Sequence, residues 1–194
     1  MQEFIHHKVK VIEEFFVEFN QVQRLYGDRS FDFEQRFTVF LNKLSDYFKE
    51  RGENTRESEV LRVNNMLYTV KKGFDPSKME KINSGRRELW WGFSYNGIES
   101  LETLLQDIYK KEISKLQEGK EILSNLILNL YQQGFLTDNQ LRDLDSVTKV
   151  EAFWRSLLMQ NGSMSVINKK LLTHLITEDI YLLLEEIISE IVPQ

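Results

Sequence analysis

Residues 3–25, EFIHHKVKVIEEFFVEFNQVQRL, carry the pattern that decides the fold. Apolar side chains recur there at steps of three and four residues, which is the spacing of one face of an α-helix. The members of this series are Ile5, Val9, Ile12, Phe15, Phe16, Phe19 and Val22. Gly27 is expected to end the helix. The stretch therefore predicts an amphipathic helix that buries one face against other helices.

The same period recurs along most of the chain. A second helix is predicted over residues 33–51, and Gly52 follows it where a C-terminal cap is expected. Further helices are predicted over residues 55–72, 96–134, 141–162 and 166–191. Thr137 and Gln140 have the spacing of a capping box, in which each side chain satisfies a free backbone donor near the other residue.

Three positions leave alternatives open. The end of the third helix, MLYTV at residues 66–70, could also form a strand, since β-branched and aromatic residues favour that state. Gly119 is a soft point at which the fourth helix could break in two. Thr177 is a plausible restart within the last helical stretch.

Together these helices predict an all-α fold, a multi-helix bundle of six to eight helices. The strongest candidate boundary lies between Gly134 and Thr137. It divides an N-terminal helical bundle, residues 1–134, from a helical C-terminal subdomain, residues 135–194. We expect the two parts to form one compact unit.

The composition excludes several classes of chemistry. The chain has 194 residues and no cysteine, which removes thiol catalysis, iron–sulfur clusters and disulfide frameworks. It contains neither a nucleophile elbow nor a glycine-rich phosphate loop. No cofactor is expected, and catalysis is not the favoured function.

The sequence carries no signal for a membrane. The most apolar stretch, residues 180–192, contains three glutamates and is shorter than the ~20 residues that a bilayer crossing needs. The first thirty residues mix charges through every turn and show no signal peptide. A cytoplasmic protein without membrane contact is expected.

Charge is unevenly distributed. The net charge is −5, yet residues 62–93 hold seven basic and three acidic side chains. An acidic total opposes general nucleic-acid affinity, which depends on an excess of lysine and arginine over the contact face. Nucleic acid is therefore not expected as a partner.

Residues 83–97, NSGRRELWWGFSYNG, combine two arginines with four aromatic residues. Arginine and tryptophan dominate the hot spots of protein interfaces, which makes this segment the candidate partner-binding surface. The predicted contact residues are Arg86, Arg87, Trp90 and Trp91, with Lys71 and Lys72 providing electrostatic steering. The alternative is a helical turn that feeds Leu89, Trp90 and Phe93 into the core.

Four glutamates form the basis of a rival hypothesis. Glu99 and Glu102 make one Glu-x-x-Glu pair, and Glu118 and Glu121 make a second. The arrangement loosely resembles the acidic pairs of all-α nucleotide pyrophosphohydrolases of the MazG and dimeric dUTPase kind. That resemblance implies a magnesium-dependent nucleotide hydrolase with the two pairs on separate helices. Here the second pair ends in Glu121 rather than in aspartate, and both pairs can lie on one helix.

The last helix carries a broad apolar stripe. Its members are Ile180, Leu183, Leu184, Ile187, Ile188 and Ile191. The favoured interpretation is that the stripe docks on the rest of the chain, and the alternative is the seam of a homodimer.

The sequence as a whole predicts a non-catalytic protein-interaction module, whether an adaptor, a regulatory protein or a neutralising protein. Its partner would be another protein.

Overall fold

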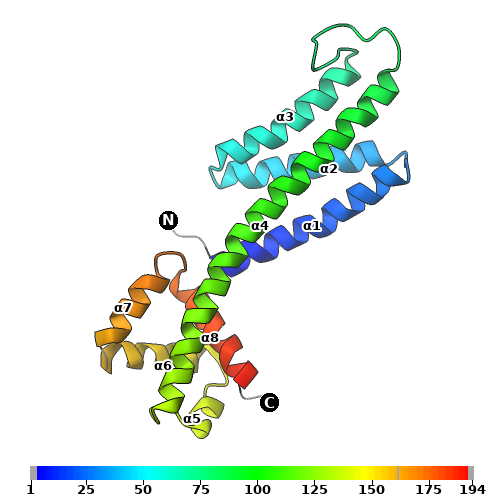
Figure 1. The fold of residues 1–194 in the computed structure, drawn as a ribbon. Coiled ribbons are helices and arrows are strands. Elements are labelled where there is room, and N and C mark those ends of the chain that lie inside the picture. The colour runs from blue at the N-terminus through cyan, green and yellow to red at the C-terminus, as the bar shows by residue number, and fades with distance from the viewer. Residues whose placement is uncertain (1–3, 161, 192–194) are drawn as a thin grey trace. The chain divides into compact units, whose positions relative to one another are not determined.

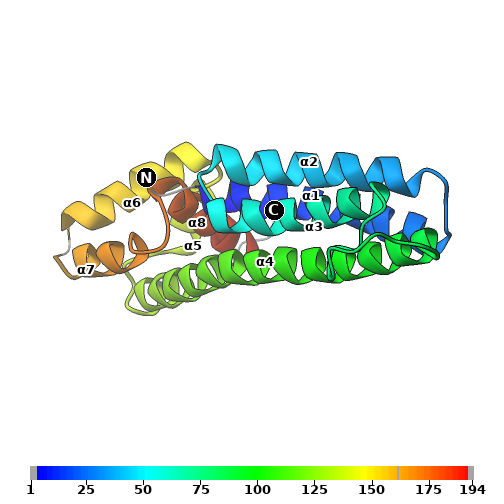
Figure 2. The ribbon, with the colours of Figure 1, turned by 90° about the horizontal axis from the view of Figure 1, so that it is seen from above.

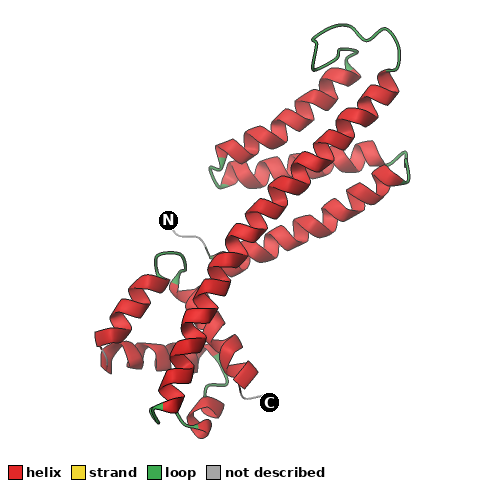
Figure 3. Ribbon diagram, in the orientation of Figure 1, coloured by secondary structure: helices red, strands yellow, loops and turns green. Residues whose placement is uncertain are grey.

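The structure is a computed structural model that describes residues 4–160 and 162–191. Within those residues it contains eight α-helices and no strand (Figures 1 and 3). The helices are α1 (Ile5–Gly27), α2 (Phe33–Glu50), α3 (Asn54–Lys71), α4 (Arg86–Gln132), α5 (Asp138–Asp143), α6 (Val147–Gln160), α7 (Gly162–Leu171) and α8 (Thr177–Ile191). The predicted all-α fold of six to eight helices is confirmed.

Several helix bounds agree with the prediction, and others do not. The first three helices begin and end within two residues of the predicted positions, and residues 66–70 are helical, so the strand alternative is wrong. α4 begins at Arg86 rather than at residue 96. The stretch 141–162 does not form one helix, because residues 144–146 interrupt it between α5 and α6. The restart at Thr177 is confirmed as the first residue of α8.

The predicted capping box at the start of α5 is present. The backbone N–H of Gln140 donates to Thr137 Oγ1 at 3.4 Å, and the backbone N–H of Thr137 donates to Gln140 Oε1 at 2.9 Å. Two backbone donors that have no partner within the helix are satisfied in this way.

The chain divides into two compact units. Residues 12–108 form the bundle unit, and residues 1–11 together with 109–194 form the C-terminal unit. α1 and α4 each contribute residues to both units. The division at residue 134 that the sequence suggests falls within the C-terminal unit, and it stays a prediction.

The bundle unit is built from the larger part of α1, from α2 and α3, and from the first half of α4. Its core is rich in phenylalanine, and Phe19, Phe33, Phe37 and Phe48 are almost completely buried. The α1–α2 loop and the α3–α4 loop lie at the same end of this unit (Figure 2). Residues distant in sequence therefore meet at that end.

The C-terminal unit has a separate core around the apolar stripe of α8. Five of the six stripe residues are buried in it: Ile180, Leu183, Leu184, Ile187 and Ile188. Only Ile191, which is 49% exposed, remains outside. The interpretation that the stripe docks within the chain is confirmed. A homodimer through this helix stays a prediction, with most of the stripe already used in the fold.

Glycine permits close packing at two places on α4. A Cβ atom at Gly97 would lie 2.6 Å from Val63 Cγ1, and one at Gly119 would lie 2.5 Å from Leu175 Cδ1. Both distances are too short for a side chain without movement of the neighbour. Gly119 is thus a packing position in a continuous 47-residue helix, so of the two alternatives that the sequence left open, one long helix is correct.

Candidate functional site

The segment singled out by the sequence forms the first turns of α4. Arg86 and Arg87 are exposed, whereas Trp90 and Trp91 are half-buried. The ring of Trp91 stacks on Phe33 at 5.2 Å between centroids with an interplanar angle of 16°, and Trp90 meets the same ring edge-on at 5.7 Å. The two indoles therefore pack on Phe33 while part of each remains accessible.

Tyr26, near the end of α1, holds Trp91 from another side. The two rings lie 5.1 Å apart, and the Tyr26 hydroxyl donates a hydrogen bond to the backbone oxygen of Trp91 at 3.3 Å. Aromatic pairs of this geometry contribute about 0.5–1.5 kcal/mol beyond their buried area. This contact ties the end of α1 to the start of α4.

A cleft of about 380 Å³ lies beside the two tryptophans. We call it the basic-aromatic cleft. It is lined by Arg29, Phe31, Phe33 and Glu34 at the α1–α2 junction, by Val70 and Lys71 at the end of α3, and by Arg86, Arg87, Trp90 and Trp91 on α4. Five of the six predicted contact residues therefore meet in one place.

Lys72, the sixth predicted contact residue, is not part of the cleft lining. Its Nζ atom lies 5.1 Å from the centroid of the Tyr68 ring, which is the geometry of a cation–π contact.

Sequence reasoning missed the contribution of the α1–α2 loop. Phe31 is 97% exposed, and it lines the cleft together with Arg29. A phenylalanine between Ser30 and Asp32, outside any helical period, is the one local signal that could have drawn attention to this loop. Nothing in the local pattern says that the loop lies beside α4.

The cleft carries an excess of positive charge. Lys71 Nζ lies 2.6 Å from Glu34 Oε1, so these two charges neutralise each other. Arg29, Arg86 and Arg87 make no ion pair with any acidic side chain in residues 4–160 and 162–191. Three guanidinium groups of the cleft lining are therefore not neutralised by an ion pair within the described residues.

The backbone of Arg29 is strained. Its φ of 50° lies in the left-handed region, which costs most residues about 1–2 kcal/mol. The N–H of Ser30 donates to the oxygen of Leu25 and that of Arg29 to the oxygen of Tyr26, which is the Schellman pattern at a helix end. The ends of α2, α3 and α4 have the same pattern with a glycine in this position: Gly52, Gly73 and Gly134. At the end of α1 the equivalent position is occupied by an arginine with a strained backbone, and this arginine lines the cleft.

The four glutamates of the rival hypothesis do not come together. All of them lie on α4, with Glu99 and Glu102 in the bundle unit and Glu118 and Glu121 in the C-terminal unit. Glu102 accepts a hydrogen bond from the Gln23 side chain at 3.1 Å. In the described ranges, no three histidine, cysteine, aspartate or glutamate side chains are arranged to hold a metal ion.

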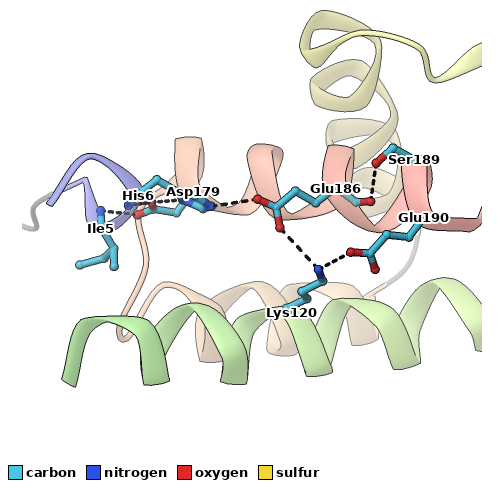
Figure 4. A network of polar contacts seen from close by, with 7 residues as sticks. All are labelled: Ile5, His6, Lys120, Asp179, Glu186, Ser189 and Glu190. Carbon is cyan, nitrogen blue, oxygen red and sulfur yellow. Dashed lines mark hydrogen bonds and ion pairs between the residues drawn. The ribbon is translucent and has the colours of Figure 1, made fainter. Parts of the chain in front are cut away.

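A second polar cluster surrounds Asp179, which is completely buried in the C-terminal unit (Figure 4). Its carboxylate accepts hydrogen bonds from the backbone N–H groups of Ile5 at 3.2 Å, His6 at 3.0 Å and Ile176 at 3.2 Å. It also accepts one from His6 Nδ1 at 2.7 Å. Asp179 therefore caps the first turn of α1 from α8, and its negative charge lies at the positive end of that helix.

These bonds also determine the protonation of Asp179. Burial raises the pKa of this carboxyl, but the hydrogen bonds from His6, Ile5 and Ile176 outweigh it and hold the pKa below its usual value. The cluster continues along α8, where Lys120 Nζ lies 2.7 Å from Glu190 Oε1 and 3.6 Å from Glu186 Oε2. The hydrogen bonds to Asp179 all come from other parts of this chain and fix the start of α1. We therefore interpret the cluster as a structural helix cap.

Comparison with known protein families, with characterised proteins and with solved structures finds no match for this chain. Among the helices of the described residues, none combines the length and the apolar character required to cross a bilayer.

Proposed function

We propose that this chain is a non-catalytic protein-interaction module, of the adaptor, regulatory or neutralising kind, which binds a partner protein at the basic-aromatic cleft. The observation that carries the proposal is Phe31, which is 97% exposed at the rim of a cleft that also holds two tryptophans and three unpaired arginines. The proposal includes a cytoplasmic location.

The exposed Phe31 side chain leaves a favourable burial free energy unused in the fold. Burying a phenylalanine side chain contributes about 1.5–3 kcal/mol relative to leaving it in water. The fold does not use this contribution, whereas a partner that covers the cleft does. Tryptophan and arginine around the same cleft are the residue types enriched at the centres of protein interfaces.

The strain at Arg29 supports the same function. Glycine in that position would remove the cost of the left-handed backbone, as it does at the ends of three other helices. Backbone strain that the fold does not require is typical of binding sites. The Arg29 side chain forms no ion pair with an acidic side chain in the described residues, so no such pair offsets the cost of its backbone.

A matched pair of double variants tests the proposal. Phe31→Ala with Arg87→Glu alters the cleft, and Phe135→Ala with Lys111→Glu likewise removes one exposed phenylalanine and reverses one exposed positive charge elsewhere. Each tagged protein is used for affinity capture from an extract of the source cells, and captured proteins are quantified by mass spectrometry. Circular dichroism verifies that both variants are folded.

We expect at least one protein to be captured equally by the wild type and the control variant, and about tenfold less by the cleft variant. The proposal is overturned if all three folded proteins capture the same set in the same amounts.

A further inference from the structure

We propose that the cleft binds a short acidic segment of the partner, in which carboxylates flank one large apolar side chain. This inference rests on the proposed function and specifies the chemistry of the partner. It is carried by three features of the cleft: its unpaired guanidinium groups, its aromatic lining and its size.

The three unpaired arginines of the cleft favour a ligand that carries carboxylates. A guanidinium donates two parallel hydrogen bonds to a carboxylate, and such charge-assisted pairs are stronger than neutral ones. Arg29 reaches the cleft from the α1–α2 loop, and Arg86 and Arg87 reach it from α4. Because Lys71 is already paired with Glu34, the three arginines provide the net charge that a ligand meets.

The aromatic lining of the cleft favours an apolar side chain between those carboxylates. The half-buried Trp90 and Trp91, which pack on the buried Phe33, present aromatic surface inside the cleft, and Phe31 stands exposed at its edge. A side chain such as phenylalanine or leucine would bury this surface and cover Phe31. A wholly polar acidic segment would leave the aromatic surface in water.

The size of the cleft limits the occupant to a short segment. Its volume of about 380 Å³ is near the lower end of the range for small-ligand pockets, which begins at about 300 Å³. An α-helix with its side chains is about 10–12 Å across and needs a long groove. One apolar side chain with its neighbouring backbone matches the available space.

Acidic side chains near the cleft favour a peptide over a polyanion. Glu34 lines the cleft, and Asp32 and Glu88 are exposed next to lining residues in the sequence. A nucleic acid or an anionic membrane binds through a continuous basic face and would meet these carboxylates. A peptide with two or three carboxylates can match the arginines individually.

Selection from a library of random peptides displayed on phage identifies the preferred chemistry. The targets are the wild type, the double variant Arg86→Glu with Arg87→Glu, and the control Lys110→Glu with Lys111→Glu, which reverses two adjacent exposed charges on the same helix. The expected result is that the wild type and the control enrich sequences with aspartate or glutamate around one aromatic or large aliphatic residue. The arginine variant should not enrich them.

Fluorescence anisotropy with an enriched, fluorescein-labelled peptide then measures each contribution. Replacing its acidic residues by their amides, or its apolar residue by alanine, should each weaken binding about tenfold or more. Binding should weaken as salt is added, because exposed charge pairs are screened. A peptide with lysine in place of its acidic residues should bind the arginine variant better than it binds the wild type.

The possible outcomes separate this inference from the proposed function. Enrichment that depends on the cleft but shows no acidic residues overturns the inference and leaves the proposed function standing. Cleft-dependent binding to phosphatidylserine vesicles or to a mixed-sequence oligonucleotide, without peptide enrichment, overturns both. The absence of cleft-dependent binding to any of these probes also overturns both.

Discussion

Replacing Asp179 by alanine removes a buried carboxylate that accepts four hydrogen bonds from Ile5, His6 and Ile176. A buried donor left without an acceptor costs about 1–3 kcal/mol. The His6 side chain is 18% exposed, so water can partly replace the bond that its ring loses. We therefore expect the free energy of unfolding to fall by about 3–5 kcal/mol, the range for breaking a buried polar pair.

Urea unfolding at neutral pH, followed by far-UV circular dichroism, measures this loss. Asp179→Asn keeps the shape and one acceptor oxygen, so it should lose less than the alanine variant. Asp143→Ala is the matched control, because Asp143 is an exposed aspartate of the same unit, and it should change stability by no more than about 0.5 kcal/mol.

The pH dependence gives an independent check. The pKa of Asp179 is lowered in the folded chain, so its contribution is present above the unfolded pKa of about 3.9 and is lost as pH falls through the folded pKa. The stability difference between the wild type and Asp179→Asn should therefore shrink in that acidic range. A loss below about 1 kcal/mol in the alanine variant at neutral pH, or a difference that grows with acid, would refute the capping role.

Three further changes have defined outcomes. Arg29→Gly should raise the free energy of unfolding by about 0.5–1 kcal/mol, because it relieves the strain of the left-handed backbone. An unchanged or lower free energy in urea unfolding would contradict that strain. The same variant should weaken partner binding. Gly97→Ala should lower stability by about 1–3 kcal/mol through overlap with Val63, and an unchanged melting temperature would argue against close packing there. Glu112→Gln removes the charge of a buried carboxylate that lies 3.4 Å from Lys8 and also pairs with Lys115, and it should lower the free energy of unfolding by about 1–3 kcal/mol; an unchanged value in urea unfolding would mean that these charge pairs do not stabilise the fold.

Local spacing was sufficient for much of the secondary structure. The first three helices and the capping box at Thr137 were predicted because helical periods and caps depend on residues within about four positions of each other. The same reasoning left open whether Gly119 breaks the helix, whereas the structure shows that it admits Leu175 at close range. A glycine that weakens a helix and a glycine that permits close packing look identical within their own turn.

The candidate site shows the same limit. The composition of residues 83–97 pointed to Arg86 and Trp90, because these residue types are concentrated in one short segment. It could not reveal Phe31 and Arg29, which reach the cleft only when the α1–α2 loop folds beside α4, more than fifty positions away in the chain. Nor could it identify Asp179 as the cap of a helix that begins at the opposite terminus. Periodicity specifies which face of a helix is buried, whereas the neighbour it meets depends on how all the helices pack together.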